Sequence, residues 1–256
     1  MSGVTGISSS TSDMYGKIAS GKRINSAADD ASGLTIAEKL KEQSNGLSAG
    51  ASNAKDGVNA LNIADGALGS INDSLQRIYE LSVKASNSAI YSAGDIGAMQ
   101  DEISGLLDGI QGVAKGTEYN QMKLLDGSMA DMQLATNPDG TGQSIKMQNS
   151  TLEALGIDGY DVTGDFDIKR ITNAMDMVNK SRSLIGASTN ALESAYNYNV
   201  YANQNTTAAQ SGIEDLDVAK AISEQKKNSL MDSYQNMMQR QQMKDKEQSV
   251  LGLLQF

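Results

Sequence analysis

A seven-residue repeat of apolar side chains constrains the fold of this chain more than any other feature. Leucine or alanine stands at every seventh position, with no proline in the stretch, at Leu40, Leu47, Ala54, Leu61, Leu68 and Leu75. This spacing places the side chains on one seam of an α-helix, as in a coiled coil. Residues 34–86 are therefore predicted to form a single helix, roughly 80 Å long at about 1.5 Å per residue. Few compact domains hold such a helix.

A second helix is predicted over residues 95–116. Its apolar positions alternate at spacings of three and four, from Ile96 to Val113. Ser92 and Asp95 form a Ser-x-x-Asp pattern, which predicts a capping box at its start.

Helical periodicity returns in the last third of the chain. A third helix is predicted from residue 167 to about residue 209, with Gly212 as its C-cap. After an N-cap at Asp215 or Asp217, a last helix is predicted over residues 218–253.

The middle of the chain has a different period. Between residues 122 and 150 apolar and polar residues alternate, and the sequence 137–140 (NPDG) is typical of a tight turn. A β-hairpin is predicted there, followed by one short helical turn at residues 152–155. The predicted fold class is mainly α: an elongated antiparallel helical bundle or coiled coil with a small β-hairpin region at one end.

The composition narrows the functions that the chain can have. Its formal net charge is −10, and no local basic patch offsets the repulsion of nucleic acid or anionic membranes. It contains no histidine and no cysteine, which removes the commonest general base, the commonest metal ligand and every thiolate. The adjacent Asp29 and Asp30 lack a histidine partner and are better explained as acids at a helix start. We predict no enzymatic activity, no catalytic residue, no metal, no cofactor, and neither a nucleic-acid nor a membrane partner.

No secretory signal or membrane span is expected. The first ten residues contain no basic stretch followed by an apolar run, and no run of about 18 apolar residues occurs.

Four segments, in order along the chain, resemble one protein family. They are residues 18–34 (IASGKRINSAADDASGL), 75–87 (LQRIYELSVKASN), 211–219 (SGIEDLDVA) and 250–254 (VLGLL). The first resembles the N-terminal signature of bacterial flagellins, and the second resembles the Leu-Gln-Arg-x-Arg-Glu-Leu stretch of that family. The third resembles the linker before the last flagellin helix, and the fourth resembles the usual flagellin ending. The resemblance covers nearly the whole chain.

This resemblance implies a structural subunit that self-assembles into the extracellular filament of the bacterial flagellum. The implied partners are other flagellin subunits, the flagellar export apparatus, an export chaperone and the filament cap. The implied domains are a short inner N-terminal helix (1–22), the N-terminal part of a rod (23–125), a short variable hairpin region (126–165), the C-terminal part of the rod (166–211) and an inner C-terminal helix (212–256).

The chain departs from the flagellin pattern near both ends. Only 20 residues precede Gly21, fewer than flagellins usually carry there. Residues 237–247 (MMQRQQMKDKE) replace an alanine-rich apolar stretch. A minor or assembly-defective flagellin is therefore one alternative. A hook–filament junction protein is another, although such proteins tend to carry proline where residues 26–33 have none. A chemoreceptor-like signalling hairpin, from a different class, would have a helical tip.

The resemblance also implies two sets of site residues. Subunit contacts are expected in the loop from Arg23 to Gly33 and at the C-terminal end, through Arg23, Ile24, Asn25, Asp29, Asp30, Leu251 and Leu254.

The second set, Gln76, Arg77, Leu81 and Glu102, matches positions at which the vertebrate Toll-like receptor 5 binds flagellins. Arg77 and Leu81 are four residues apart, hence on one helix face, and an exposed arginine beside an apolar residue is typical of an interface anchor. The alternative is an ordinary bundle surface with an Arg77–Glu80 or Arg77–Glu102 ion pair.

Overall fold

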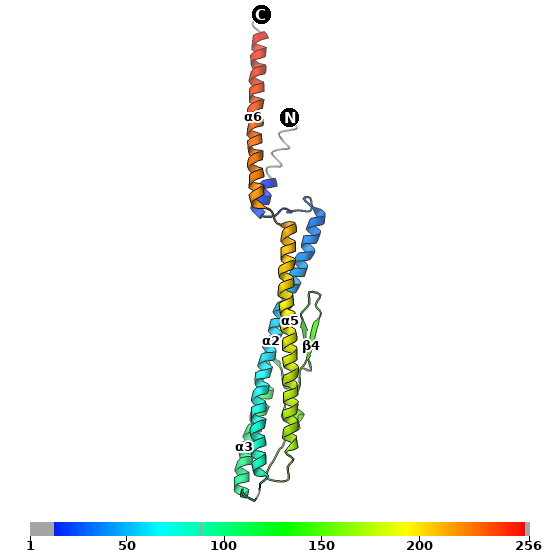
Figure 1. Ribbon diagram of the computed structural model, residues 1–256, viewed down its shortest axis with the longest axis vertical. Helices are drawn as coiled ribbons and strands as arrows, with labels where there is room; N and C mark the ends of the chain where they lie inside the picture. Colours follow the sequence, from blue (N-terminus) through cyan, green and yellow to red (C-terminus); the bar gives the residue numbers. More distant parts are fainter. Residues whose placement is uncertain (1–12, 88, 254–256) are drawn as a thin grey trace. The chain divides into compact units, whose positions relative to one another are not determined.

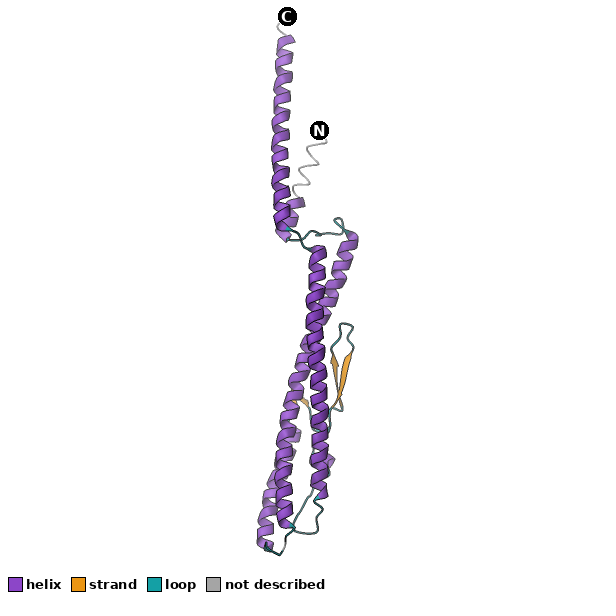
Figure 2. Cartoon of the chain, viewed as in Figure 1, coloured by secondary structure: helices purple, strands orange, loops and turns teal. Residues whose placement is uncertain are grey.

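The computed structural model describes the backbone of residues 13–87 and 89–253, and side chains up to residue 248. It confirms the predicted mainly α fold class. The helices are α2 (Ala31–Ala85), α3 (Ala93–Gly116), α4 (Leu152–Leu155), α5 (Lys169–Glu214) and α6 (Val218–Leu253), and residues 13–20 are also helical (Figure 1). Two antiparallel hairpins join β1 (Glu118–Tyr119) to β2 (Met122–Lys123) and β3 (Asp131–Ala135) to β4 (Gly142–Lys146) (Figure 2).

The chain divides into two compact units. The first contains residues 1–44 and 204–256, and the second contains residues 45–203, so α2 and α5 each contribute to both. The domain boundaries implied by the flagellin resemblance follow the family pattern instead, and they stay predictions.

The core of the second unit is built on the predicted seam of α2. Leu61, Leu68 and Leu75 are fully buried there, together with Ile103 and Ile110 of α3. Helix α5 supplies the third side of this core, with Ile171, Ala174, Val178, Ile185 and Leu192. Burial of each large aliphatic side chain contributes about 1.5–3 kcal/mol. The seven-residue repeat therefore predicted the helix and its buried face correctly.

One predicted helix end is confirmed and another is wrong. The backbone N–H of Asp95 donates to the Ser92 hydroxyl over 3.3 Å, and the N–H of Ser92 donates to the Asp95 carboxylate over 2.9 Å, which completes the predicted capping box. Gly212 does not cap α5, because that helix continues through it to Glu214. The N-cap of α6 is Asp217, whose carboxylate accepts from the N–H of Lys220 over 3.0 Å.

The β3–β4 hairpin lies along α2 within the second unit. A Cβ built on Gly50 would stand 2.4 Å from the carbonyl oxygen of Thr136, and one on Gly46 would stand 2.8 Å from Cβ of Pro138. Gly57 meets Leu134 in the same way, at 2.4 Å. These glycines therefore let the hairpin approach α2 closely, and Gly50 and Gly57 also leave room for Asn199 and Leu192 of α5.

The remaining interior glycines of the long helices serve no such approach. A Cβ built on Gly66, Gly69, Gly105 or Gly109 would meet nothing within 4 Å. Each costs α2 or α3 about 1 kcal/mol relative to alanine without a compensating contact inside the subunit.

The β1–β2 hairpin was not predicted. Its two turn residues, Asn120 and Gln121, have φ values of 47° and 65°. Such turns are usually signalled by Asn-Gly, and glutamine in the second position hides the signal.

The described ranges, 13–87 and 89–253, include no helix that is long and apolar enough to cross a membrane. They also include no group of three or more acidic side chains placed to hold a metal ion.

Candidate functional site

The segment from Gly21 to Asp30 pairs with the linker between α5 and α6, within the first unit. Lys22 and Asp215 form an isolated antiparallel β-bridge. On either side of it, the N–H of Arg23 donates to the carbonyl of Glu214 over 2.7 Å, and the N–H of Leu216 donates to the carbonyl of Gly21 over 2.9 Å. Gly21 has a φ of +69°, a conformation that glycine adopts readily and other residues do not. We call residues 21–30 and 213–217 together the loop–linker junction.

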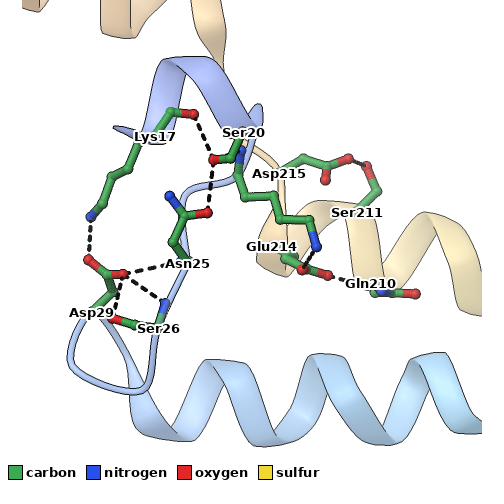
Figure 3. A network of polar contacts seen from close by, with 10 residues as sticks. Lys17, Ser20, Asn25, Ser26, Asp29, Gln210, Ser211, Glu214 and Asp215 are labelled. Carbon is green, nitrogen blue, oxygen red and sulfur yellow. Dashed lines mark hydrogen bonds and ion pairs between the residues drawn. The ribbon is translucent and has the colours of Figure 1, made fainter. Parts of the chain in front are cut away.

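Side chains reinforce this backbone pairing. The ammonium of Lys22 forms a hydrogen-bonded ion pair with Glu214, and the amide of Gln210 donates to the other carboxylate oxygen over 2.9 Å (Figure 3). These two donors, Lys22 first, hold the pKa of Glu214 below its usual value, and Glu214 in turn raises the pKa of Lys22. The guanidinium of Arg23 donates to the carbonyl of Ile213 over 2.6 Å.

Asp29 organises the other side of the junction. One carboxylate oxygen of Asp29 accepts from the N–H groups of Asn25 (3.1 Å) and Ser26 (3.0 Å), and the second pairs with the ammonium of Lys17 at 2.8 Å (Figure 3). Lys17, followed by the two N–H donors, lowers the pKa of Asp29 to about 2. Asp29 is therefore a structural anion that fixes the loop.

Asp30 caps α2, and the nearby Ile24 is buried. Its carboxylate accepts from the N–H of Gly33 over 2.8 Å, and its carbonyl accepts from the N–H of Leu34 over 2.9 Å. Ile24 is only 1% exposed. In the single subunit this buried side chain holds the loop against α2, and its expected part in subunit contacts stays a prediction.

The acids of the junction are engaged in contacts within and between its two segments. Its acids Asp29 and Glu214 already accept hydrogen bonds from the loop or from lysine side chains. Arg23, Asn25 and Asp29 remain on the surface, where a neighbouring molecule can reach them. Of the other predicted assembly residues, Leu251 lies in α6 beyond the described side chains, and Leu254 lies outside the described residues.

The second predicted set lies on α2 and α3 of the second unit. The guanidinium of Arg77 donates to Glu102 over 2.7 Å and to Glu80 over 3.2 Å, and its side chain is 42% exposed. Both carboxylates, Glu102 first, raise the pKa of Arg77. Gln76 is exposed beside them.

Leu81 does not belong to this surface. It is only 3% exposed and packs in the core of the second unit. The expectation of an exposed apolar residue beside Arg77 is wrong, because Leu81 follows the buried Ile78 by three residues and precedes the buried Ala85 by four.

An exposed apolar face on α6 was missed in the sequence. We define the α6 apolar face as Leu230, Met231, Tyr234, Met237 and Met238, whose exposed fractions run from 43% to 71%. At 3.6 residues per turn these positions fall within about 120° of the helix circumference. The polar residues that follow Met238 hide this face in the sequence. The spacing of Leu230, Tyr234 and Met237 at intervals of four and three nevertheless indicates an apolar stripe on a helix.

Residues 1–130 match the bacterial flagellin N-terminal helical region, and residues 168–254 match the bacterial flagellin C-terminal helical region.

Similar proteins point the same way. The flagellin of Bacillus subtilis is 34% identical over 276 residues, covering 93% of this chain and 90% of the relative. The flagellar filament 30.7 kDa core protein of Treponema maltophilum is 32% identical, covering 84% of this chain and 82% of the relative. The crystal structure of Bacillus cereus flagellin shares the fold, with a TM-score of 0.51 and 23% identity over 58% of this chain and 88% of that chain. With both terminal regions matched and relatives aligned over most of its length, this chain belongs to the bacterial flagellin family.

Proposed function

We propose that the chain is a structural subunit of the extracellular flagellar filament, in which its partners are further flagellin subunits. One observation carries this proposal beyond family membership. Leu230, Tyr234 and Met237 of the α6 apolar face are 71%, 59% and 65% exposed in the single subunit. A continuous apolar stripe on a long helix is stabilised when another helix packs against it and removes it from water. In a filament, we infer, a second copy of the chain provides that helix.

The loop–linker junction supports the same function. It ties the N-terminal segment to the start of α6 through Lys22–Glu214 and the Arg23–Glu214 backbone pair. We infer that Arg23, Asn25, Asp29 and Asp30 form a polar rim around contacts whose apolar part lies on α6, joined by Leu251 and Leu254. Polar rims around apolar centres are the usual anatomy of protein interfaces.

Export precedes assembly in this proposal. The subunit would leave the cell through the flagellar export apparatus, accompanied by an export chaperone and placed by the filament cap. These partners are inferred from family membership.

Electron microscopy of the purified full chain under polymerising conditions tests the proposed function. Helical filaments are the expected result, and persistent monomer would contradict it and favour an assembly-defective flagellin. A double variant, Leu230→Glu with Tyr234→Glu, is expected to abolish filaments because it buries charge in the contact. The matched control is Met243→Glu, at an equally exposed position (67%) on the other side of α6, which is expected to retain filaments.

A second candidate function is recognition by Toll-like receptor 5. It is favoured by the position of Arg77, whose half-exposed guanidinium is held in place by Glu102 and Glu80. Arginine fixed in one orientation loses less conformational entropy on binding. The receptor surface that we propose consists of Gln76, Arg77 and Glu102, without the buried Leu81.

A further inference from the structure

We propose that Met231, Met237 and Met238 on the α6 apolar face are sites of reversible oxidation by peroxides, and that their conversion to the sulfoxide blocks assembly. This inference rests on the proposed function, because the α6 apolar face acts through contact with another copy of the chain.

Exposure separates these methionines from the interior ones. Met231, Met237 and Met238 are 51%, 65% and 43% exposed, whereas Met132 and Met147 are each 6% exposed. A peroxide in solution therefore reaches the thioethers of α6 in the free subunit, while the fold shields the two core thioethers.

The composition makes methionine sulfur the preferred target. The chain has 13 methionines but no cysteine, no tryptophan and no histidine, so no thiol, indole or imidazole competes for the oxidant. In the reaction, the sulfur lone pair attacks one peroxide oxygen, an S–O bond forms and the O–O bond breaks. The sulfur loses two electrons and the second peroxide oxygen leaves as water. Methionine sulfoxide reductases reverse the change with thiol as reductant, and each acts on one sulfoxide epimer.

The sulfoxide changes the character of the surface. Methionine is an adaptable apolar side chain, whereas its sulfoxide is polar and chiral. Three such groups within the stripe would be buried in every subunit contact without built-in hydrogen-bond partners, which opposes association. Assembly in turn removes the thioethers from solvent, so oxidation and polymerisation exclude each other. The sensitive period is the time that a subunit spends unassembled.

The first experiment maps the sites and does not depend on polymerisation. The monomeric full chain is treated with graded hydrogen peroxide, and sulfoxide is quantified at each methionine by mass spectrometry. We expect Met231, Met237 and Met238 to oxidise at doses that leave Met132 and Met147 intact. Equal oxidation of surface and core methionines, or no oxidation on α6, would overturn the proposal.

The second experiment measures assembly of untreated, oxidised and reductase-repaired protein. Oxidation is expected to raise the concentration needed for filament formation about tenfold or more, and repair by both reductases is expected to restore it. The triple variant Met231→Leu, Met237→Leu and Met238→Leu keeps volume and helix propensity, so it should assemble normally and resist peroxide.

Control variants test whether the loss of assembly after oxidation comes from the α6 apolar face and not from other methionines. Met243→Leu, on the other side of α6, removes a thioether of a residue that is 67% exposed. The double variant Met122→Leu with Met177→Leu, in the second unit, removes those of residues that are 41% and 39% exposed. Assembly of both control variants should stay peroxide-sensitive. Loss of assembly in the oxidised triple variant would overturn the proposal. Failure of the untreated natural chain to form filaments contradicts the proposed function instead, and the mapping experiment still decides where oxidation occurs.

Discussion

The Asp30 carboxylate leaves no room for a side chain at Gly33, in the first turn of α2. The N–H of Gly33 donates to one oxygen of the Asp30 carboxylate over 2.8 Å, and a Cβ on residue 33 would stand 2.4 Å from the other oxygen. The same Cβ would stand 2.8 Å from Cδ1 of Ile24. A side chain at residue 33 would therefore disturb both the Asp30 cap and the buried Ile24.

The substitution Gly33→Ala should consequently behave unlike other glycine replacements in α2. Alanine gains about 1 kcal/mol in an open helix position, but here it must turn Asp30 away from the cap, at about 1 kcal/mol, and displace Ile24. Gly66→Ala, whose Cβ would meet nothing within 4 Å, is the matched control. We expect the free energy of unfolding in urea to be about 1–2 kcal/mol higher for Gly66→Ala than for Gly33→Ala. Equal stabilisation by both would show that the cap tolerates the methyl group.

Gly50→Ala should detach the β3–β4 hairpin from α2. The new Cβ would lie 2.4 Å from the carbonyl oxygen of Thr136, a backbone atom, and 3.0 Å from the amide nitrogen of Asn199. That amide is buried and donates to the same carbonyl over 2.7 Å. We expect a loss of about 2 kcal/mol or more in the free energy of unfolding, from overpacking and the broken hydrogen bond.

A double-variant cycle identifies the cause of that loss. Asn199→Ala removes the same hydrogen bond, so the two substitutions together should cost less than their sum. Gly69→Ala, in open space on the same helix, is expected to be neutral or stabilising. Strict additivity of Gly50→Ala and Asn199→Ala would mean that the clash does not act through this hydrogen bond.

The sequence predicted features that depend on local spacing. Leu61 and Leu68 could be assigned to the core because a seven-residue repeat has one interpretation in a long helix. Ser92 and Asp95 could be assigned to a cap because both partners lie within one turn. The resemblance to flagellins then supplied the family, which periodicity alone would not have distinguished from other helical bundles.

Features that depend on which distant segments meet were not predictable in the same way. Nothing in the spacing of Gly50 identifies Thr136 as its neighbour, because that contact is set by the path of a hairpin along the helix. Glu214 was missed as the partner of Lys22 for the same reason, since 192 residues separate them. Leu81 is different: its spacing from Ile78 and Ala85 already indicated burial, and the receptor resemblance outweighed that signal.

Acid should loosen the loop around Asp29. Its pKa is lowered from 3.8 to about 2 by Lys17 and by the N–H groups of Asn25 and Ser26. A carboxylate with a depressed pKa stabilises the folded state above its unfolded pKa, and that contribution is lost as the pH falls from about 4 through 2. The amide resonances of Asn25 and Ser26 should therefore shift in NMR spectra across this window, together with the Asp29 carboxyl carbon. Lys17→Met should move the transition to higher pH, whereas Lys180→Met in the second unit should leave it unchanged.

Substitutions at Arg77 and Leu81 should separate the receptor surface from the core. Arg77 is half-exposed and pairs with Glu102 of the neighbouring helix α3, so Arg77→Ala is expected to leave the free energy of unfolding almost unchanged. Leu81 is 3% exposed, so Leu81→Ala should lower the free energy of unfolding by about 2–5 kcal/mol through the cavity it leaves.

If the receptor binds at Gln76, Arg77 and Glu102, Arg77→Ala weakens binding to the Toll-like receptor 5 ectodomain about tenfold or more, as measured by surface plasmon resonance. Leu81→Met, which keeps the volume, should leave affinity unchanged. Unaltered binding by Arg77→Ala would remove this surface from consideration, whatever its effect on folding.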